Sequence, residues 1–484
     1  MLKEKNINNL VRRQRKYFNT CDSHQIQPLD IGHRNYIGLI SPDTAFWVLV
    51  KKIRLGRALT GPSLLKKYSK KANGFFKEMN TLRFELKPSA VYFNPTDLCN
   101  LNCSYCYIPE DLRKNGKHMS SRRLLEALKI LKAYFRFSLP KGHKPEGSGL
   151  ASDSQSQKPQ IIFHGAEPLL NKKAVFSAID KFSQDFRFGI QTNATLLDTE
   201  AIEFLTSREI SIGLSLDGHI PKVADRLRRT WNGKGVSQEV IKAIQRLKNY
   251  HNYSVICTVT KENMASQVKI VEFLHQMEVP TCMLNPVRCT LSGSRKYRPL
   301  DSDIAKHYLK ALDRVYQLYQ KTGRKLVVAN FANVLIGIIA PLARRLMCDI
   351  SPCGGGRCFF AVSSSGDIFP CSEFIGVKKF KGGNIFNDDI NNVLESKPFE
   401  LVTKRSIEHI KSCSHCAIRH FCGAPCPAEA WQINGSIETR GAFCELYKEQ
   451  VRYAFRVIAN NKEDAYLWAG WDKDTVTTFK MTEL

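Results

Sequence analysis

The chain has 484 residues, of which 43% are hydrophobic and 24% charged, and this balance excludes a globally disordered protein. The length predicts two or three domains. The formal net charge of +27 favours a polyanionic partner, an acidic peptide substrate or a generally basic surface, and the lysines and arginines are spread along the chain rather than in one stripe.

The sixteen cysteines are many for this length, and they cluster late in the chain in close pairs. That pattern indicates metal binding in a reducing cytoplasm rather than secreted disulfides. The first residues lack the apolar core of a signal peptide. The longest charge-free apolar run, 326–343, contains polar residues and falls short of the about 20 apolar residues that a membrane helix needs, so we expect buried core and no membrane partner.

Residues 1–88 contain no motif and are expected to form an N-terminal α+β extension. Residues 34–41 predict a strand, and residues 42–53 predict a short helix with one apolar face. A strand followed by helices suits a peptide-docking module. It suits a plain cap over the next domain equally well.

From residue 89 onward strands and helices alternate, which is the pattern of a parallel sheet with crossover helices. The predicted strands are 89–94, 160–164, 188–192, 210–216, 254–259 and 281–286. The predicted helices are 119–135, 172–182, 199–205, 237–247, 266–277 and 301–319. Residues 139–160, rich in Gly, Ser and Pro, are expected to be a partly disordered surface loop. The fold class is therefore α/β.

Three cysteines, Cys99, Cys103 and Cys106, follow the first of these strands with the spacing C-x3-C-x2-C. Thiolate is the soft ligand that iron-sulfur chemistry selects, and a [4Fe-4S] cluster normally takes four of them, so three leave one iron open. The loop is expected at the C-terminal end of a strand, where α/β folds place their chemistry. A zinc knuckle and scattered buried thiols are the alternatives.

This spacing, with Tyr105 just before the third cysteine, resembles the signature loop of the radical S-adenosylmethionine (SAM) enzymes. The resemblance implies that SAM chelates the open iron and that an electron from the reduced cluster cleaves it. The 5'-deoxyadenosyl radical that results abstracts a hydrogen atom from the substrate. The resemblance also implies a partial (β/α)6 TIM-like barrel over 89–323 and an external one-electron reductant of the flavodoxin or ferredoxin type.

The stretch His164-Gly165-Ala166-Glu167-Pro168 follows the second strand and resembles the G-G-E-P element of this family. The resemblance implies that Glu167 receives the ammonium group of SAM. Ala166 replaces the second glycine, and alanine costs little if φ is negative but much if φ is positive. The backbone geometry of this turn is therefore open.

Polar residues that follow the third and fourth strands resemble further SAM contacts of related maturases. These candidates are Gln191, Thr192, Asn193, Ser215 and Asp217. Arg228 lies in a D-x-x-R pattern followed by G-x-G, and it is the candidate for the SAM carboxylate because a guanidinium can pair with it bidentately. Arg226 and Arg229 lie near enough to leave that choice open.

Eight later cysteines follow the pattern C-x12-G-x4-C, then C-x2-C-x5-C-x3-C, then a single C, with one more cysteine inside the first interval. This spacing resembles the SPASM domain, which is expected over 324–447 and is followed by a C-terminal helix and tail at 448–484. The resemblance implies two auxiliary [4Fe-4S] clusters, and so three clusters in all. A near cluster would be held by Cys353, Cys358, Cys371 and Cys426, and a far cluster by Cys413, Cys416, Cys422 and Cys444. A pair of zinc ribbons is the alternative.

Five cysteines remain outside these sets. They are Cys21, Cys257, Cys282, Cys289 and Cys348. Cys257 and Cys282 lie on predicted strands and are expected to be inert buried thiols. The sequence assigns no role to Cys289 or Cys348.

These resemblances predict an enzyme that modifies a peptide or protein substrate, expected to be encoded nearby, by cross-linking or side-chain oxidation. Anaerobic sulfatase maturases share the scaffold, but residues 330–333 lack the carboxylate expected of their base. Maturases of bacteriocin-like precursors and of quinohemoprotein amine dehydrogenase fit better in general plan. The sequence does not name the catalytic residues. A basic iron-sulfur or zinc protein that binds RNA is the rival from another class, although a nucleic-acid partner is not our expectation.

Overall fold

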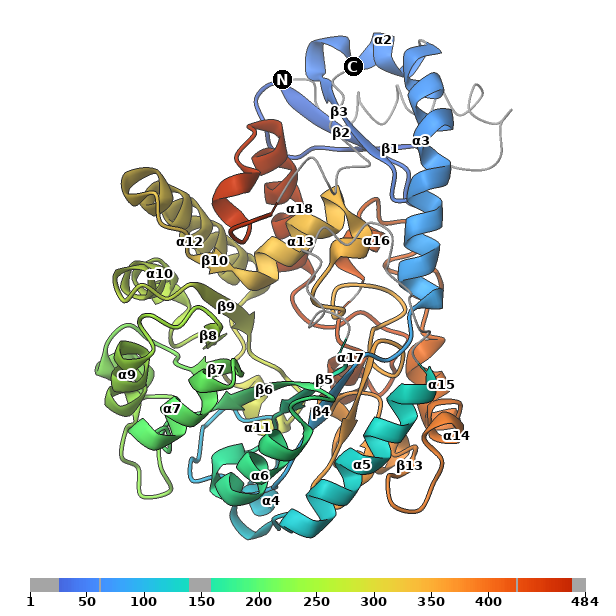
Figure 1. The fold of residues 1–484 in the computed structure, drawn as a ribbon. Coiled ribbons are helices and arrows are strands. Elements are labelled where there is room, and N and C mark those ends of the chain that lie inside the picture. The colour runs from blue at the N-terminus through green and yellow to red at the C-terminus, as the bar shows by residue number, and fades with distance from the viewer. Residues whose placement is uncertain (1–25, 61, 139–157, 424, 472–484) are drawn as a thin grey trace.

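The computed structural model describes residues 26–60, 62–138, 158–423 and 425–471. Most of the predicted loop at 139–160 and the whole segment that contains Cys21 lie outside these ranges. Within them, a small antiparallel sheet precedes a large, mostly parallel sheet flanked by helices (Figure 1).

The small sheet has the order β1-β2-β3 and is antiparallel throughout. Its strands are β1 (Gln27–Leu29), β2 (Tyr36–Ile40) and β3 (Trp47–Lys51). The predicted strand at 34–41 is confirmed, whereas the predicted helix at 42–53 is wrong. The run Trp-Val-Leu-Val consists mostly of aromatic and β-branched residues, which favour strands. Its side chains are buried on both faces of the strand, so its apolar residues do not mark one face of a helix.

Helices α2 (Leu55–Thr60) and α3 (Pro62–Asn80) and the turn η2 (Thr81–Glu85) connect this sheet to the barrel. On α3, Phe75 packs edge-on against Phe46, with ring centroids 5.8 Å apart. On the C-terminal side, Trp47 donates from Nε1 to the carbonyl of Ile338 at 2.8 Å and packs against Phe455. The extension is therefore held between α3 and the C-terminal part of the chain.

The six predicted barrel strands are confirmed and pair in parallel in chain order. They are β4 (Ala90–Phe93), β5 (Gln160–Phe163), β6 (Arg187–Thr192), β7 (Ser211–Ser215), β8 (Tyr253–Val259) and β9 (Thr281–Pro286). The six predicted helices are present close to their expected bounds. They are α5 (Ser121–Ser138), α6 (Lys172–Phe182), α7 (Thr199–Ser207), α9 (Ser237–Arg246), α10 (Gln267–Gln276) and α12 (Asp301–Thr322). These helices lie on the outer side of the curved sheet (Figure 1).

The large sheet continues beyond the barrel at both edges. β10 (Val327–Val328) adds in parallel to β9, and β11 (Phe359–Val362) adds in parallel to β4. β12 (Asp367–Phe369) and β13 (Gly383–Asn384) follow in antiparallel pairing. Strands from the cysteine-rich region therefore belong to the same sheet as the barrel strands. Within the described residues this sheet has ten strands.

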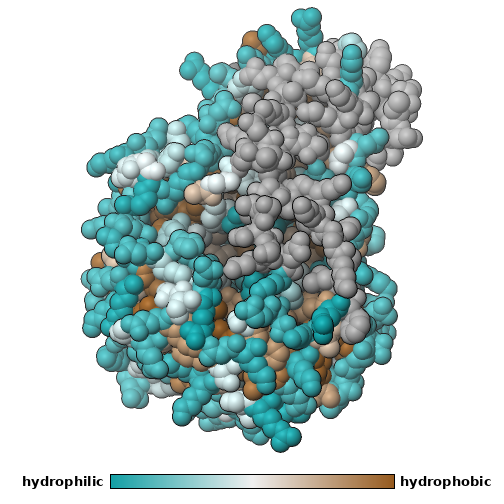
Figure 2. All heavy atoms as spheres, in the orientation of Figure 1, coloured by the Kyte–Doolittle hydropathy of each residue, from teal (hydrophilic) through white to brown (hydrophobic). Residues whose placement is uncertain are grey.

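The apolar run at 326–343 is buried core, as predicted, and most of it forms α13 (Ala329–Ile339). The remaining helices of this region are α14 (Ile390–Leu394), α15 (Lys397–Thr403), α16 (Arg419–Cys422), α17 (Pro427–Asn434) and α18 (Cys444–Ala459). None of the helices in the described ranges combines the length and hydrophobicity required to cross a lipid bilayer. On the face seen in Figure 2, the coloured surface is mainly hydrophilic, with hydrophobic residues between the polar ones over the barrel.

Candidate active site

The first cysteine loop leaves the C-terminal end of β4 and is held against the ends of β5 and β6. Glu167 donates its backbone N–H to the carbonyl of Leu98 at 3.0 Å. Asn193, which follows β6, donates from Nδ2 to Asn100 Oδ1 at 2.8 Å and to Cys99 Sγ at 3.8 Å. Residues from three neighbouring strand ends therefore meet at the first cysteine.

The segment 227–231 holds the other side of the same loop. The backbone N–H of Asn102 donates to the carbonyl of Arg229 at 2.7 Å, and that of Ser104 donates to the carbonyl of Leu227. Trp231 donates from Nε1 to the carbonyl of Cys99 at 2.8 Å. Supporting contacts of this kind fix the direction of metal-binding side chains before the metal arrives.

The three thiols of this loop lie close enough for their charges to act on one another, and their assignment as cluster ligands stays a prediction. Burial raises the pKa of Cys99 to about 12 and that of Cys103 to about 11, and the charge of Cys106 raises both. Iron binds the thiolate, so cluster assembly displaces these protons. Three neighbouring soft donors fit a [4Fe-4S] cluster with one open iron. In the described ranges no three His, Cys, Asp or Glu side chains converge on a single metal position.

Glu167 is fully buried beneath the loop. Its Oε1 accepts hydrogen bonds from the backbone N–H of Leu169 at 3.1 Å and the hydroxyl of Thr192 at 2.8 Å, and its Oε2 accepts from the backbone N–H of Asn193 at 2.7 Å. Burial raises the pKa of Glu167, while these three hydrogen bonds and the charge of Arg228 oppose that shift. The carboxylate therefore joins β5 to β6. Its contact with SAM stays a prediction.

The question about the G-A-E-P turn is answered by its backbone. Gly165 has φ +104°, and a Cβ there would lie 2.3 Å from Cγ of Asn94. Ala166 is not among the residues with positive φ. The one position in this turn that requires glycine has kept it, and alanine at the next position carries no backbone strain.

Three of the other predicted contacts lie on strands or directly after them. Gln191 is within β6, and its Cγ would lie 3.2 Å from a Cβ placed on Gly213 of the neighbouring strand β7. Ser215 is the last residue of β7. Asp217 follows two residues later, fully buried, and accepts from the backbone N–H of Thr258 at 2.8 Å.

Arg228 and Asp217 are joined through the aromatic residue of the cysteine loop. Tyr105 donates its hydroxyl to Asp217 Oδ2 at 2.5 Å, and Arg228 donates from Nη1 to the Tyr105 oxygen at 2.6 Å. Arg228 Nη1 also lies 3.6 Å from Asp217 Oδ2. This buried triad fixes Tyr105, and through it Cys106, to the end of β7. Nε of Arg228 is buried without a hydrogen-bond partner among the described residues.

The D-x-x-R and G-x-G pattern is explained by local structure around Asp225. Its carboxylate accepts hydrogen bonds from the backbone N–H groups of Val236 and Ser237 and from the Ser237 hydroxyl. A Cβ on Gly235 would lie 2.2 Å from Cγ of Asp225, and Gly233 has φ +80°. The pattern therefore forms the turn that precedes α9, and Arg228 lies in this turn.

A buried arginine, Arg405, lies near four of the eight later cysteines. Cys353 and Cys358 are buried, Cys444 is exposed, and the other five are partly exposed. Burial lowers the pKa of Arg405, and the charges of Cys353 and Cys426 from the near set, and of Cys413 and Cys422 from the far set, raise it. Arg405 is thus near thiols of both predicted sets, which no sequence pattern indicated. A cation there would offset the negative charge of thiolate-bound clusters in those sets.

Two further charged residues lie near the cysteines, and no sequence motif marks them. Arg288 follows β9, and its Nε lies 3.7 Å from Oε1 of Glu373, two residues after Cys371. The charge of Glu373 is the largest charge effect raising the pKa of Tyr107, a phenol whose main perturbation is burial. Their positions two residues after a strand and two residues after a cysteine were the available signal.

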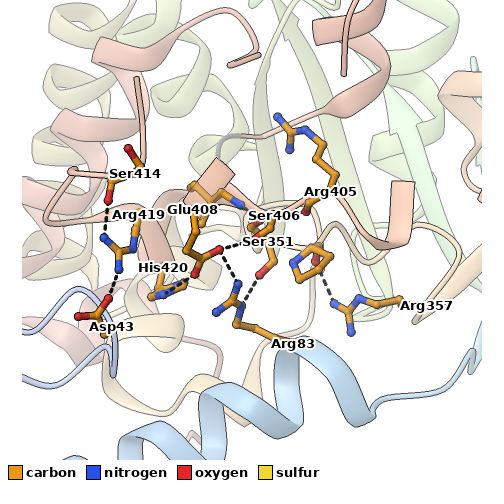
Figure 3. Close-up of polar contacts among 12 residues, drawn as sticks. Asp43, Arg83, Ser351, Arg357, Arg405, Ser406, Glu408, Ser414, Arg419 and His420 are labelled. Carbon is orange, nitrogen blue, oxygen red and sulfur yellow. Dashed lines mark hydrogen bonds and ion pairs between the residues drawn. The ribbon is translucent and has the colours of Figure 1, made fainter. Parts of the chain in front are cut away.

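Polar contacts join the N-terminal extension to the segment of the far cysteines (Figure 3). Arg83 donates from Nη2 to Glu408 at 2.9 Å, and Arg419 pairs with Asp43. Burial acts to raise the pKa of Glu408, but a hydrogen bond from Ser406 and the charge of Arg83 bring it down to about 2. Glu408 and Arg419 lie on either side of Cys413 and Cys416 in the sequence, so the extension and the far site are mechanically connected.

Comparison with known proteins identifies the family. The model of the radical SAM superfamily matches residues 150–274, and the SPASM model, an iron-sulfur cluster-binding domain, matches residues 353–417. The chain is a radical SAM enzyme with a SPASM region. An uncharacterized protein of Archaeoglobus fulgidus is 37% identical to this radical SAM enzyme over 434 residues, which is 90% of this chain and 94% of that protein.

Named relatives of this radical SAM enzyme are more distant. A cysteine-type anaerobic sulfatase-maturating enzyme of Clostridium perfringens is 24% identical over 78% of this chain and 98% of its own length. The solved structure of anSMEcpe with bound AdoMet and Cp18Cys peptide covers 78% of this chain and 99% of that one, with a TM-score of 0.65 and 20% identity. The structure of SuiB of Streptococcus suis, bound to the precursor peptide SuiA, matches 85% of this chain and 98% of the SuiB chain. Its TM-score is 0.54 and its sequence identity is 14%. The fold is the radical SAM partial barrel with an added antiparallel sheet and a SPASM region.

Proposed function

We propose that this enzyme reductively cleaves SAM and uses the resulting radical to modify a peptide or protein. The observation that carries the proposal is the attachment of the three-cysteine loop to the ends of β5, β6 and β7. The comparison with structures that hold a peptide supports the substrate class, because two proteins of the same fold bind peptides.

In this proposal Cys99, Cys103 and Cys106 hold a [4Fe-4S] cluster with one open iron. When bound, the cluster and SAM supply a one-electron cleavage that yields the 5'-deoxyadenosyl radical. Asn193 keeps the loop in place by binding Asn100 and approaching Cys99.

The residues around the loop would shape the SAM site. Glu167, Thr192 and Asn193 form one hydrogen-bonded unit, so they position the SAM-facing surface of β5 and β6 together. Arg228 keeps Tyr105 in place, and its Nε, unsatisfied within the described residues, is the group that we assign to the SAM carboxylate. Gln191 and Ser215 extend the same surface along β6 and β7.

The SPASM region would hold two fully ligated auxiliary clusters in the near and far sets. Support comes from the eight thiols and from Arg405, whose pKa responds to thiols of both sets. Full ligation by four thiolates favours electron transfer, so we assign these clusters to carrying electrons between the substrate and an external flavodoxin- or ferredoxin-type protein.

For the extension we propose the cap. The strands β2 and β3 are almost wholly buried, and they are held by Phe75 on one side and by Ile338 and Phe455 on the other. A docking module for a peptide strand would use an open edge of this sheet, and β3 pairs only with β2 among the described strands, so its other edge is where a peptide would add. If addition of a leader peptide slowed amide hydrogen exchange in β3, that result would favour a docking module instead.

The central experiment is anaerobic reconstitution of the full chain. We expect about twelve bound irons, from three clusters of four, and cleavage of SAM to 5'-deoxyadenosine on reduction. Cys99→Ala should abolish SAM cleavage. Cys257→Ala should not, because Cys257 is a fully buried thiol within β8 and belongs to no donor set. A colourless, zinc-loaded protein, or a Cys99→Ala variant that still cleaves SAM, would refute the proposal.

Sulfatase maturation is a second candidate, favoured by the named relatives. The sequence argument against it was the lack of a carboxylate at 330–333. In the structure Asn330 bonds the backbone of Leu284, and Asn333 binds Asp349 and the backbone around it, so these residues are structural and say nothing about a base. Incubation with a cysteine-containing sulfatase peptide, followed by mass spectrometry, distinguishes the candidates. An unchanged cysteine in that peptide would exclude sulfatase maturation.

The RNA-binding rival makes a different prediction. Binding that rests on charge weakens steeply as salt rises, whereas SAM cleavage does not depend on RNA. Tight RNA binding that disappears between low and physiological salt, without SAM cleavage, would favour the rival.

A further inference from the structure

A basic surface loop lies beside the one exposed thiol of the eight later cysteines. The loop covers residues 287–300, between β9 and α12, and it contains four arginines and lysines but no aspartate or glutamate. Three of these cations, Arg295, Lys296 and Arg298, are exposed. Within the described part of the chain, none of the three forms an ion pair with an acidic residue.

Two contacts hold the end of this loop against the segment around Cys444. The carboxylate of Asp301, directly after the loop, accepts hydrogen bonds from the backbone N–H groups of the two residues that follow Cys444, at 2.8 and 2.9 Å. The guanidinium of Arg298 lies over the ring of Phe443, 5.3 Å from its centroid. Contacts on both sides of Cys444 therefore place the loop beside this thiol, which is exposed at the start of α18.

Leu300 gives this surface an apolar centre. It is 71% exposed. In the chain it lies between Arg298 and Asp301, the two residues that contact the Cys444 segment. A single exposed leucine is ordinary on a protein surface and indicates nothing by itself. An apolar residue surrounded by polar ones is, however, the composition of a protein–protein interface, and here it lies next to unpaired cations.

Further cations lie along α17, on the other side of the loop. Arg295, the last residue of α11 (Ser292–Arg295), donates from Nη2 to the carbonyl of Gln432 at 2.5 Å. Nζ of Lys379, an exposed residue, lies 3.8 Å from the centroid of the Trp431 ring. These two contacts on adjacent residues of α17 bring Lys379 and the loop to the same surface.

The positive charge of this surface outweighs the acidic residues around it. We call its four cations and its leucine the basic patch, which consists of Arg295, Lys296, Arg298, Leu300 and Lys379. Within 292–303, 378–379 and 431–446, six lysines and arginines are exposed, against the exposed acidic residues Asp303, Glu438 and Glu445. A surface of one net sign raises the rate at which a partner of the opposite sign arrives.

We propose that the basic patch docks a small acidic protein that carries one electron, and that the electron crosses at Cys444. The inference rests on the proposed function, because it takes Cys444 as a ligand of the far [4Fe-4S] cluster. One electron leaves the reduced cluster and enters the oxidised carrier; a flavin carrier also takes up one proton from water. Redox partners of this kind form small, short-lived interfaces, which a few exposed cations around one leucine are sufficient to build.

The kinetic test mixes the full chain, anaerobically reconstituted and reduced, with an oxidised flavodoxin. Flavin semiquinone should form with a second-order rate constant that falls as salt rises, because salt screens the charges that steer the encounter. Lys296→Glu combined with Arg298→Glu should lower this constant at least about tenfold at low salt. Leu300→Ser should lower it at every salt concentration, since an apolar contact is not screened.

Lys129→Glu combined with Arg136→Glu is the matched control. Both residues are exposed on α5, beside β4, whereas the patch follows β9 at the other end of the six barrel strands. The two double variants change the charge equally, and both should keep about twelve irons and cleave SAM with dithionite as reductant. A patch variant that reacts as fast as wild type, or no faster or slower than the α5 variant, would overturn the inference.

Carbodiimide cross-linking locates the contact without depending on the clusters. The reagent joins a lysine amine to a carboxylate that touches it, so Lys296 and Lys379 should be linked to flavodoxin and Lys129 should not. Links spread evenly over these lysines contradict a docking site. An RNA oligonucleotide that loses affinity in the patch variant, while the flavodoxin reaction is unchanged, would assign the patch to nucleic acid instead. Failure of the proposed function shows separately, as wild-type protein that lacks the iron or does not cleave SAM.

Discussion

At the residue scale, the cysteine loop is organised by side chains that satisfy buried polar groups. Glu167 accepts three hydrogen bonds, and the Tyr105–Asp217–Arg228 triad connects the loop to β7. A buried donor or acceptor left without a partner costs about 1–3 kcal/mol, so each of these residues is coupled to its neighbours. Substitution of one member should therefore disturb SAM binding and stability together.

The G-A-E-P turn gives a pair of contrasting substitutions. We expect Gly165→Ala to disrupt the turn, because φ is +104° and the new Cβ would lie 2.3 Å from Asn94, whereas Ala166→Gly should be tolerated. SAM affinity of the reconstituted variants, measured by equilibrium dialysis, should fall at least about tenfold for Gly165→Ala, which is a change of about 1.4 kcal/mol. Wild-type affinity in Gly165→Ala would contradict this geometry.

Glu78 of α3 predicts a pH dependence of stability. Burial raises its pKa from 4.5 to about 7, although a hydrogen bond from the backbone of Leu342 opposes the shift. Because the folded state holds the proton more tightly, stability falls as pH rises from about 4.5 through 7. Glu78→Gln should raise the free energy of unfolding at pH 8 by about 1 kcal/mol, discounted for partial exposure, and leave it unchanged near pH 4.5.

Chemical denaturation of the cluster-free variants at both pH values checks this prediction. Glu203→Gln is the control, since Glu203 is an exposed glutamate on α7 and should show no such difference. An effect of Glu78→Gln that is equal at both pH values would exclude the titration of this carboxyl as its cause.

At the element scale, the extension depends on contacts with the SPASM region. β2 and β3 bury their side chains against α3 and the C-terminal helices, and Figure 3 shows the polar contacts at the end of α3. The strand that replaces the predicted helix at 42–53 follows from this packing, because a segment covered on both faces loses the alternation that usually marks a strand.

Arg83 is the residue on which to test this connection. It is 9% exposed and donates from Nε to the carbonyl of Ser351 at 2.5 Å as well as to Glu408. Arg83→Ala leaves both acceptors short of a donor, at a cost of about 1–3 kcal/mol. Amide hydrogen exchange should accelerate at 81–85 and 406–410.

Lys52→Ala is the matched control for this variant. Lys52 pairs with Asp30 at 3.7 Å on the surface, and exposed pairs of this kind contribute about 0–1 kcal/mol. Equal acceleration of exchange in the two variants would show that Arg83 has no special place in the interface.

At the scale of the whole molecule, the barrel and the SPASM region share one sheet. β11 occupies the open edge of β4, with Phe359 opposite Ala90 and Val362 opposite Phe93, and β10 occupies the edge of β9. An unpaired parallel edge of this kind invites aggregation. The boundary expected near residue 323 is therefore crossed by backbone hydrogen bonds on both sides.

A chain that ends at residue 323 tests this arrangement. It removes β10 and β11 and exposes the edges of β9 and β4, so we expect it to aggregate, whereas the full chain stays dispersed under the same conditions. Size-exclusion chromatography distinguishes the two outcomes. A monodisperse shortened chain would show that the barrel folds without its outer strands.

The sequence by itself determined the parallel sheet, the six strand–helix units and the three cysteine groups, because periodicity and motif spacing are local properties of the chain. The tertiary structure alone decided what covers β3, why Gly165 and not Ala166 must be glycine, and that Arg228 meets Tyr105 across 123 positions of sequence. It also brought Arg405 near thiols of both predicted sets. Those contacts join distant segments, and no local pattern records which side chain will be buried against which.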